Sequence, residues 1–247
     1  MTNPTPQFEI LPIDPTTDYP TLTTISLLAF QSNPLHYLTF RPSSHIPPSQ
    51  IETYHRATRI ELVGEGSSAQ TFKVIDHHEN DKIVGFARWI FEPQWPKIKG
   101  VKEPEGMDKR FIDAFREKIG DLLREHREIE KNSIELHLMR VLPEHQGKGL
   151  GSLLLNWRLS EARKEKKKVF LMASPQGRGL YLKWGFRVLG EVNLRIADFL
   201  DENELMEWRK EREGLGSKEM QREEVYVQSV MVWEPPGGGN GAEEAKI

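Results

Sequence analysis

The stretch Leu138-Met-Arg-Val-Leu-Pro-Glu-His-Gln-Gly-Lys-Gly-Leu-Gly-Ser152 is the most informative part of the sequence. Its three glycines, Gly147, Gly149 and Gly151, lie between a predicted strand and a predicted helix. Glycine permits backbone conformations that turn successive N–H groups the same way, and a helix N-terminus adds unpaired N–H groups and partial positive charge. The stretch therefore predicts a phosphate or pyrophosphate pocket, to which Lys148 could add charge. The alternative is a glycine-rich turn that binds nothing.

Two common phosphate-binding motifs do not match this stretch. The P-loop pattern GxxxxGK[ST] fails because Gly149 follows Lys148. The dinucleotide pattern GxGxxG fails because the three glycines are spaced GxGxG. If the turn binds phosphate, it therefore does so through neither of these two motifs.

Composition excludes several classes of protein. The 247 residues contain no cysteine, which excludes disulfides, cysteine nucleophiles and zinc–thiolate sites, and we expect no metal site. The formal net charge of −3 gives no general attraction to nucleic acid or to anionic membranes. No apolar run approaches the roughly 18 residues that span a bilayer. Residues 1–7 are polar and proline-rich, unlike a secretory signal, so we expect a cytosolic protein with access to the nucleus.

Hydrophobic periodicity predicts a mixed α/β chain with six to seven strands. One strand–helix–strand unit in the middle should form a parallel pair. The folded part is expected to be one domain, residues 8–233, followed by a disordered Gly/Pro-rich tail, residues 234–247. The predicted strands are 8–13, 71–76, 83–91, 134–141, 169–174, 186–194 and 225–233. The predicted helices are 18–30, 49–63, 107–130, 152–166, 179–184 and 198–213.

Two elements of the sequence resemble the GNAT superfamily of N-acetyltransferases. Gln146-Gly-Lys-Gly-Leu-Gly151 is similar to the family's acetyl-CoA motif [Q/R]-x-x-G-x-[G/A], and Met139, Val141 and Pro143 match its lead-in strand. About 30 residues later, Ala173-Ser-Pro175 and Gly179-Leu-Tyr-Leu-Lys-Trp-Gly-Phe186 resemble a second family element. The clear resemblance covers residues 134–190. The long N-terminal part and an insertion at about 92–130 resemble fungal small-molecule members.

The resemblance implies the GNAT fold, a mixed, mostly antiparallel sheet flanked by helices. In this fold two central parallel strands splay apart and acetyl-CoA lies in the gap. The pantetheine would pair with the backbone of residues 138–141, and N–H groups of residues 147–152 would hold the pyrophosphate. The cofactor-binding residues that the resemblance implies are Met139, Arg140, Val141, Gln146, Gly147, Lys148, Gly149, Leu150, Gly151, Ser152, Ser174, Gly179 and Trp184.

Three residues are candidates for proton transfer. Tyr181 resembles the tyrosine that serves many family members as general acid, although it could simply pack in the core. Glu135 and His137 alternate with apolar residues, so their side chains should share one face of a strand. Both match positions where the family places a base, and histidine suits proton transfer at neutral pH. Either residue could instead satisfy buried hydrogen bonds, and the choice of base stays open.

The predicted function is acetyl-CoA-dependent transfer of an acetyl group to a primary amine, by direct attack in a ternary complex. Transfer to oxygen, a longer acyl donor, and an acyl-CoA-binding protein without turnover are the alternatives. The acceptor is expected to be a small molecule and the protein a monomer or homodimer. Trp89 and Trp95, which border the insertion, could line the acceptor pocket.

Overall fold

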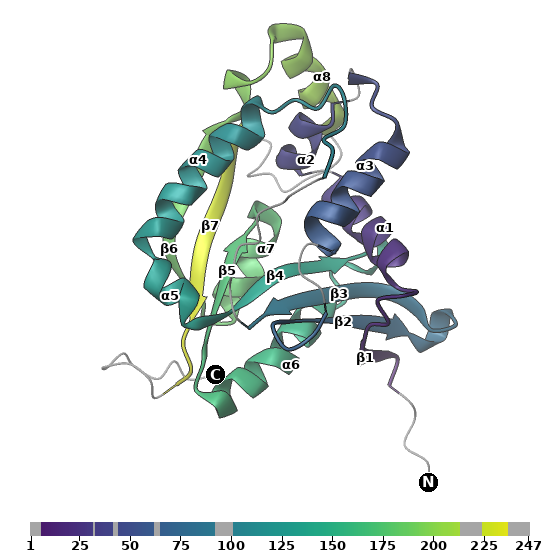
Figure 1. The fold of residues 1–247 in the computed structure, drawn as a ribbon, viewed down its shortest axis with the longest axis vertical. Coiled ribbons are helices and arrows are strands. Elements are labelled where there is room, and N and C mark those ends of the chain that lie inside the picture. Colours follow the sequence, from purple (N-terminus) through teal and green to yellow (C-terminus); the bar gives the residue numbers. More distant parts are fainter. Residues whose placement is uncertain are drawn as a thin grey trace.

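The computed structural model describes residues 6–31, 33–41, 44–61, 65–91, 101–212 and 224–236. Within them, seven strands form one sheet in the order β1-β2-β3-β4-β5-β7-β6 (Figure 1). Only β4 and β5 pair in parallel; the other neighbours are antiparallel. The strands are β1 (Phe8–Pro12), β2 (Ala69–Asp76), β3 (Lys82–Ile90), β4 (Ser133–Val141), β5 (Lys168–Ala173), β6 (Arg187–Arg195) and β7 (Val225–Trp233).

Helices cover both faces of the sheet. Figure 1 shows α1 and α3 above strands β2–β4 and α6 beneath them, while α4 runs along β6 and β7. The helices are α1 (Tyr19–Phe30), α2 (Pro34–Thr39), α3 (Pro48–His55), α4 (Arg110–Glu125), α5 (Arg127–Lys131), α6 (Leu150–Glu165), α7 (Pro175–Lys183) and α8 (Glu202–Arg212). A π-helical turn, Arg56–Ile60, continues α3. No described helix is both long and apolar enough to cross a membrane.

The two central parallel strands diverge partway along their length. Their pairing ends at Leu136 and Leu171, although β4 continues to Val141. On its other side, β4 pairs Leu136 with Trp89 and Leu138 with Arg88, so the register skips His137. His137 is therefore the extra residue of a β-bulge, which bends a strand and increases its twist. The predicted mixed sheet and its splayed central strands are confirmed.

Two apolar clusters hold the layers together. The larger packs α1 and α6 on the two faces of β2–β5 around Trp89, which is fully buried. The smaller lies between α4, α8 and strands β6 and β7, with Phe111 and Tyr226 near its centre. Trp89 is a core residue and does not border the large cavity beside β4 that is described in the next section. Its suggested place in an acceptor pocket is therefore wrong. Trp95 lies outside the described residues.

Several element boundaries differ from the expectation. The long helix predicted over 107–130 ends at Glu125 and restarts as α5, because His126 leaves the helical region at φ −109° and ψ 16°. The short helix α7 begins at Pro175, earlier than predicted, because the Ser174 side chain caps it by accepting from the Gly177 N–H. Helix α2 was not predicted; its cap is Asn33, whose side chain accepts from the Leu35 N–H.

Candidate active site

A cavity of about 990 Å³ borders the divergent part of β4. Residues 136–141 of β4 line it, together with Met172 of β5 and the N-terminal parts of α6 and α7. Its other walls come from α1–α4 and from β7. One continuous space therefore joins the glycine turn to a chamber built by the N-terminal half of the chain.

The glycine turn presents backbone to this cavity. Gly147 and Gly149 have φ of 75° and 86°, values that L side chains rarely adopt. A Cβ at either position would meet no protein atom within 4 Å. Gly149 is the N-cap of α6, and within the described chain no side chain caps this helix end. The first N–H groups of α6 are thus available to a ligand, as the sequence predicted.

Gly151 has a different role from the other two glycines. A Cβ there would lie 3.0 Å from Leu180 Cδ2, so its absence lets α6 approach α7 closely. The turn is closed by Gln146, whose Nε2 donates to the Val141 carbonyl oxygen at 3.1 Å. Helix packing and turn closure together fix the position of the N–H groups at the start of α6.

The other predicted cofactor-binding residues divide into two groups. Lys148 and Gly179 are exposed and do not border the cavity. Trp184 also lies outside its wall, but its Nε1 donates to Ser152 Oγ at 3.4 Å. The predicted residues that do line the cavity are Met139, Arg140, Val141, Gln146, Gly147, Gly149, Leu150, Gly151, Ser152 and Ser174.

Tyr181 borders the cavity from α7 and is 8% exposed. Its ring packs edge-on against Phe186, with centroids 5.6 Å apart. Gly177 makes room for the ring, since a Cβ there would lie 3.0 Å from Tyr181 Cε2. Burial raises the pKa of Tyr181 to about 12, although the nearby positive charge of Arg140 opposes the shift. The phenol therefore keeps its proton throughout the neutral range.

Glu135 and His137 lie together, as the strand pattern predicted. Glu135 Oε1 is 2.9 Å from His137 Nδ1, and both side chains are buried. His137 borders the cavity at the bulge, whereas Glu135 does not. A carboxylate that accepts from Nδ1–H leaves Nε2 as the basic nitrogen of a neutral imidazole. The pair can therefore orient one histidine nitrogen for proton transfer.

Sequence reasoning missed the side chains that build the far chamber. His36 and His55 line it with rings 6.5 Å apart, and His55 Nε2 lies 2.9 Å from Ser26 Oγ. Burial lowers the pKa of His36 to about 4 and that of His55 to about 3, so both are neutral at pH 7. Arg59 and Tyr226 complete this wall. His36, His55 and Arg59 come from α2, α3 and the π-helical turn, whereas Tyr226 comes from β7, so no local motif identifies the whole set.

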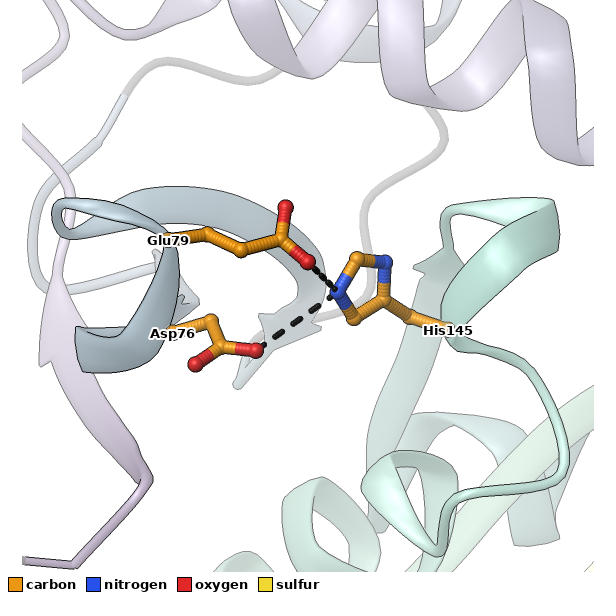
Figure 2. A group of neighbouring side chains, drawn as sticks. All are labelled: Asp76, Glu79 and His145. Atoms are coloured by element: carbon orange, nitrogen blue, oxygen red, sulfur yellow. Dashed lines mark hydrogen bonds and ion pairs between the residues drawn. The ribbon is translucent and has the colours of Figure 1, made fainter.

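A buried histidine anchors the loop that precedes the glycine turn. Figure 2 shows the His145 ring facing Asp76 and Glu79, at the end of β2 and in the turn after it. His145 Nε2 lies 3.1 Å from Glu79 Oε1 and 3.6 Å from Asp76 Oδ2. Both carboxylates have other partners, including Gln7 Nε2 and Lys82 Nζ. These contacts tie the turn after β2 to the loop that leads into the glycine turn.

Comparisons with known proteins agree with this architecture. The model of the Acetyltransferase (GNAT) family matches residues 37–186, which is more than half of the chain. A Corynebacterium glutamicum structure named histone acetyltransferase HPA2 and related acetyltransferase has a TM-score of 0.50 and 16% identity, covering 95% of this chain and 99% of that chain. At this identity the likeness concerns the fold.

Two further solved structures are similar over most of their length. The ribosomal-protein-S18-alanine N-acetyltransferase of Escherichia coli has 14% identity and a TM-score of 0.47, covering 96% of this chain and 99% of that chain. A GNAT family acetyltransferase from Elizabethkingia anophelis with acetyl-CoA bound has 15% identity and a TM-score of 0.43, covering 92% and 98%. No curated protein matches the chain. On the family match, this chain is a member of the GNAT acetyltransferase family and an acyltransferase enzyme.

Proposed function

We propose that this enzyme transfers the acetyl group of acetyl-CoA to a primary amine, by direct attack while both are bound. One observation carries the proposal: a single cavity joins the glycine turn, Tyr181 and His137. A cofactor held by its phosphates at the turn would therefore present its far end to both proton-transfer groups. Family membership supports acetyl transfer as the chemistry.

The residues that border the cavity fit acetyl-CoA. The unpaired N–H groups at the start of α6 suit a pyrophosphate, and positive φ at Gly147 and Gly149 keeps side chains out of its way. The edge of β4 that faces β5 has no strand partner beyond Leu136, so its backbone can pair with a pantetheine amide. Acetyl-CoA supplies an activated acyl group as a thioester.

The chain's own residues would handle two protons. We assign His137 as the base that takes a proton from the acceptor amine, because it borders the cavity while Glu135 does not. Glu135, 2.9 Å from His137 Nδ1, is then a positioning residue. The amine nitrogen bonds to the acyl carbon, the carbon–sulfur bond breaks, and the Tyr181 hydroxyl protonates the sulfur. Proton transfer through solvent from His137 to Tyr181 would restore both groups.

The insertion over residues 92–130 is proposed to shape the acceptor side of one domain that spans residues 8–233. Its helix α4 contributes Phe115 and Ile119 to the cavity wall. Neither residue belongs to the glycine turn or to β4, so they are free to vary the acceptor without changing the cofactor site. A small-molecule acceptor and a monomeric or homodimeric protein remain part of this proposal.

Release of the CoA thiol tests the proposal. Purified protein, acetyl-CoA and a panel of small primary amines should give thiol release with an equal amount of N-acetyl product by mass spectrometry. A product that hydroxylamine cleaves would indicate transfer to oxygen instead. Thiol release only from a longer acyl-CoA would change the donor. Tight binding of acetyl-CoA without thiol release for any amine or alcohol would identify a binding protein and refute catalysis.

A further inference from the structure

The arginines that the fold buries are paired with carboxylates. Arg41, Arg88 and Arg158 are each less than 9% exposed, and each has an acidic partner within ion-pair distance. Burying a cation is costly unless a counter-charge and hydrogen bonds compensate the lost water. The pairs are Arg41 with Asp108 and Glu204, Arg88 with Glu65, and Arg158 with Glu165.

Arg59 breaks this pattern. It is half-buried in the π-helical turn after α3 and borders the cavity. Within the described part of the chain it forms no hydrogen bond and no ion pair. Burial lowers the pKa of Arg59, and the positive charge of Arg116 lowers it further. The described part of the fold thus holds a cation at the cavity wall without providing its counter-ion.

Arg140 places a second cation on the same cavity. Its guanidinium lies 3.7 Å from the centroid of the Phe30 ring, and Nη1 donates to the Met139 carbonyl oxygen at 2.8 Å. No described carboxylate lies within ion-pair distance of it. Burial lowers the pKa of Arg140 to about 9, and Arg59 contributes in the same direction. Two uncompensated cations therefore act on one enclosed space.

The wall of the cavity holds many aromatic and aliphatic side chains and little negative charge. Among the described residues that border the cavity, Glu130 is the sole carboxylate, against five arginines. The neutral rings of His36 and His55 add no charge at pH 7. The aromatic side chains on this wall are Phe30, Phe40, Tyr54, Phe115 and Tyr226.

The titratable groups that act on Arg59 place it away from the glycine turn. They are Tyr54, Arg116 and Tyr226, which belong to α3, α4 and β7. None is part of the glycine turn at the start of α6, where the cofactor phosphates would bind. Phosphates bound at that turn would not lie beside Arg59, which leaves the other substrate to supply its counter-ion.

We propose that the acceptor is an amine that carries a carboxylate on an apolar body, and that Arg59 binds this carboxylate. The inference rests on the proposed acetylation of a primary amine and names its substrate class. A guanidinium can donate two parallel hydrogen bonds to a carboxylate, which fixes the acceptor's orientation as well as its charge. The aromatic wall would hold the apolar body.

Matched acceptors test this substrate class. L-phenylalanine and L-leucine should be acetylated with a kcat/KM at least about tenfold above that of their amides, because charged hydrogen bonds contribute about 1.5–3 kcal/mol. The comparison is made at pH 8, with each kcat/KM corrected for the fraction of that amine that is neutral. Spermidine should be a poor acceptor, since the arginines repel its charges. Equal or better use of the amides or of spermidine would overturn the proposal.

Variants of Arg59 test whether this residue causes the preference for acceptors with a carboxylate. Arg59→Met should raise KM for L-phenylalanine at least about tenfold, leave L-phenylalaninamide unchanged and leave acetyl-CoA affinity intact. Arg56→Met is the matched control, because Arg56 begins the same π-helical turn, is paired with Glu61 at 3.3 Å and does not border the cavity. It should change neither acceptor. A preference for the carboxylate that survives Arg59→Met would contradict the assignment.

The melting temperature of Arg59 variants distinguishes a binding role of Arg59 from a structural role. Removing a half-buried cation that has no counter-ion among the described residues should leave the melting temperature of Arg59→Met unchanged or raise it. A fall of several degrees that Arg59→Lys reverses, without any change in acceptor preference, would make Arg59 structural. If no amine is acetylated, the proposed function fails separately. Calorimetry of L-phenylalanine binding to wild type and Arg59→Met then still decides whether the anion site exists.

Discussion

Replacing Gly149 with alanine should separate backbone strain from the loss of a phosphate site. Gly149 has φ of 86°, and Gly185, in the turn after α7, has φ of 82°. A new Cβ would meet nothing within 4 Å at Gly149, and would touch only Trp233 Cδ1, at 4.0 Å, at Gly185. The two positions therefore impose similar strain and little steric conflict. They differ because only Gly149 borders the cavity.

The expected stability loss is similar for both variants. Alanine in the left-handed region costs about 1–2 kcal/mol. Its reduced freedom in the unfolded chain offsets about 0.4–1 kcal/mol. A net loss of about 1 kcal/mol should lower the melting temperature by about 2–4 °C in a chain of this size. Differential scanning calorimetry of Gly149→Ala and Gly185→Ala measures this shift.

The effect on acetyl-CoA should be confined to Gly149→Ala. Its methyl group would project toward the open side of the turn, where phosphate oxygens need to approach the backbone N–H groups. The Kd should rise at least about tenfold, or about 1.4 kcal/mol, with no change for Gly185→Ala. Titration calorimetry measures both. Undiminished affinity in Gly149→Ala, or an equal loss in Gly185→Ala, would refute a phosphate site at this turn.

Three further predictions concern proton transfer and pH. Tyr181→Phe should lower kcat by roughly 10²–10⁴-fold with little change in acetyl-CoA affinity. Because the pKa of Tyr181 is about 12, the kcat of the wild-type enzyme should show no alkaline limb from this residue below about pH 10. Rapid thiol-release assays check both, and an unchanged kcat would leave Tyr181 a packing residue. His137→Gln should remove the acidic limb of the kcat/KM profile, whereas Glu135→Gln should weaken the rate but retain the limb; the reverse result would make Glu135 the base. In the folded protein His36 and His55 have pKa values of about 4 and about 3, so they stay neutral. In the unfolded chain the same histidines take up protons near pH 6.5. Their contribution to the free energy of unfolding is therefore complete above that pH and falls as the pH drops toward 4. Urea unfolding should lose about 1.4 kcal/mol per histidine, or about 3 kcal/mol in total, between pH 7.5 and 5.5, and the double glutamine variant should lack that part of the loss.

Local pattern was sufficient to locate the part of the cavity that we propose for the cofactor. The glycine turn needs only consecutive residues between a strand and a helix, so Gly147, Gly149 and the start of α6 could be predicted directly. The pairing of Glu135 with His137 followed from alternation along one strand. The bulge at His137 could not be predicted, because alternation continues through it and only the register with β3 reveals it.

The part of the cavity that we propose for the acceptor is built by contacts between distant segments of the chain. Arg59 lies before β2 and Tyr226 lies in the last strand, β7, yet both border one cavity. That Arg59 has no carboxylate partner among the described residues is visible only once their positions are known, which the sequence does not give. Trp89 failed as a pocket residue for the same reason, since its place in the core is set by the packing of the helices against β3.

Binding of acetyl-CoA to the wild-type protein tests the central claim most directly. Titration calorimetry should give one site per chain with a Kd of about 1 μM or lower, and NAD should give no heat. Acetyl-CoA at a hundred times its Kd should stabilise the fold by about 2.7 kcal/mol and raise the melting temperature accordingly. No heat and no melting shift with acetyl-CoA would contradict the account of this cavity as an acetyl-CoA site.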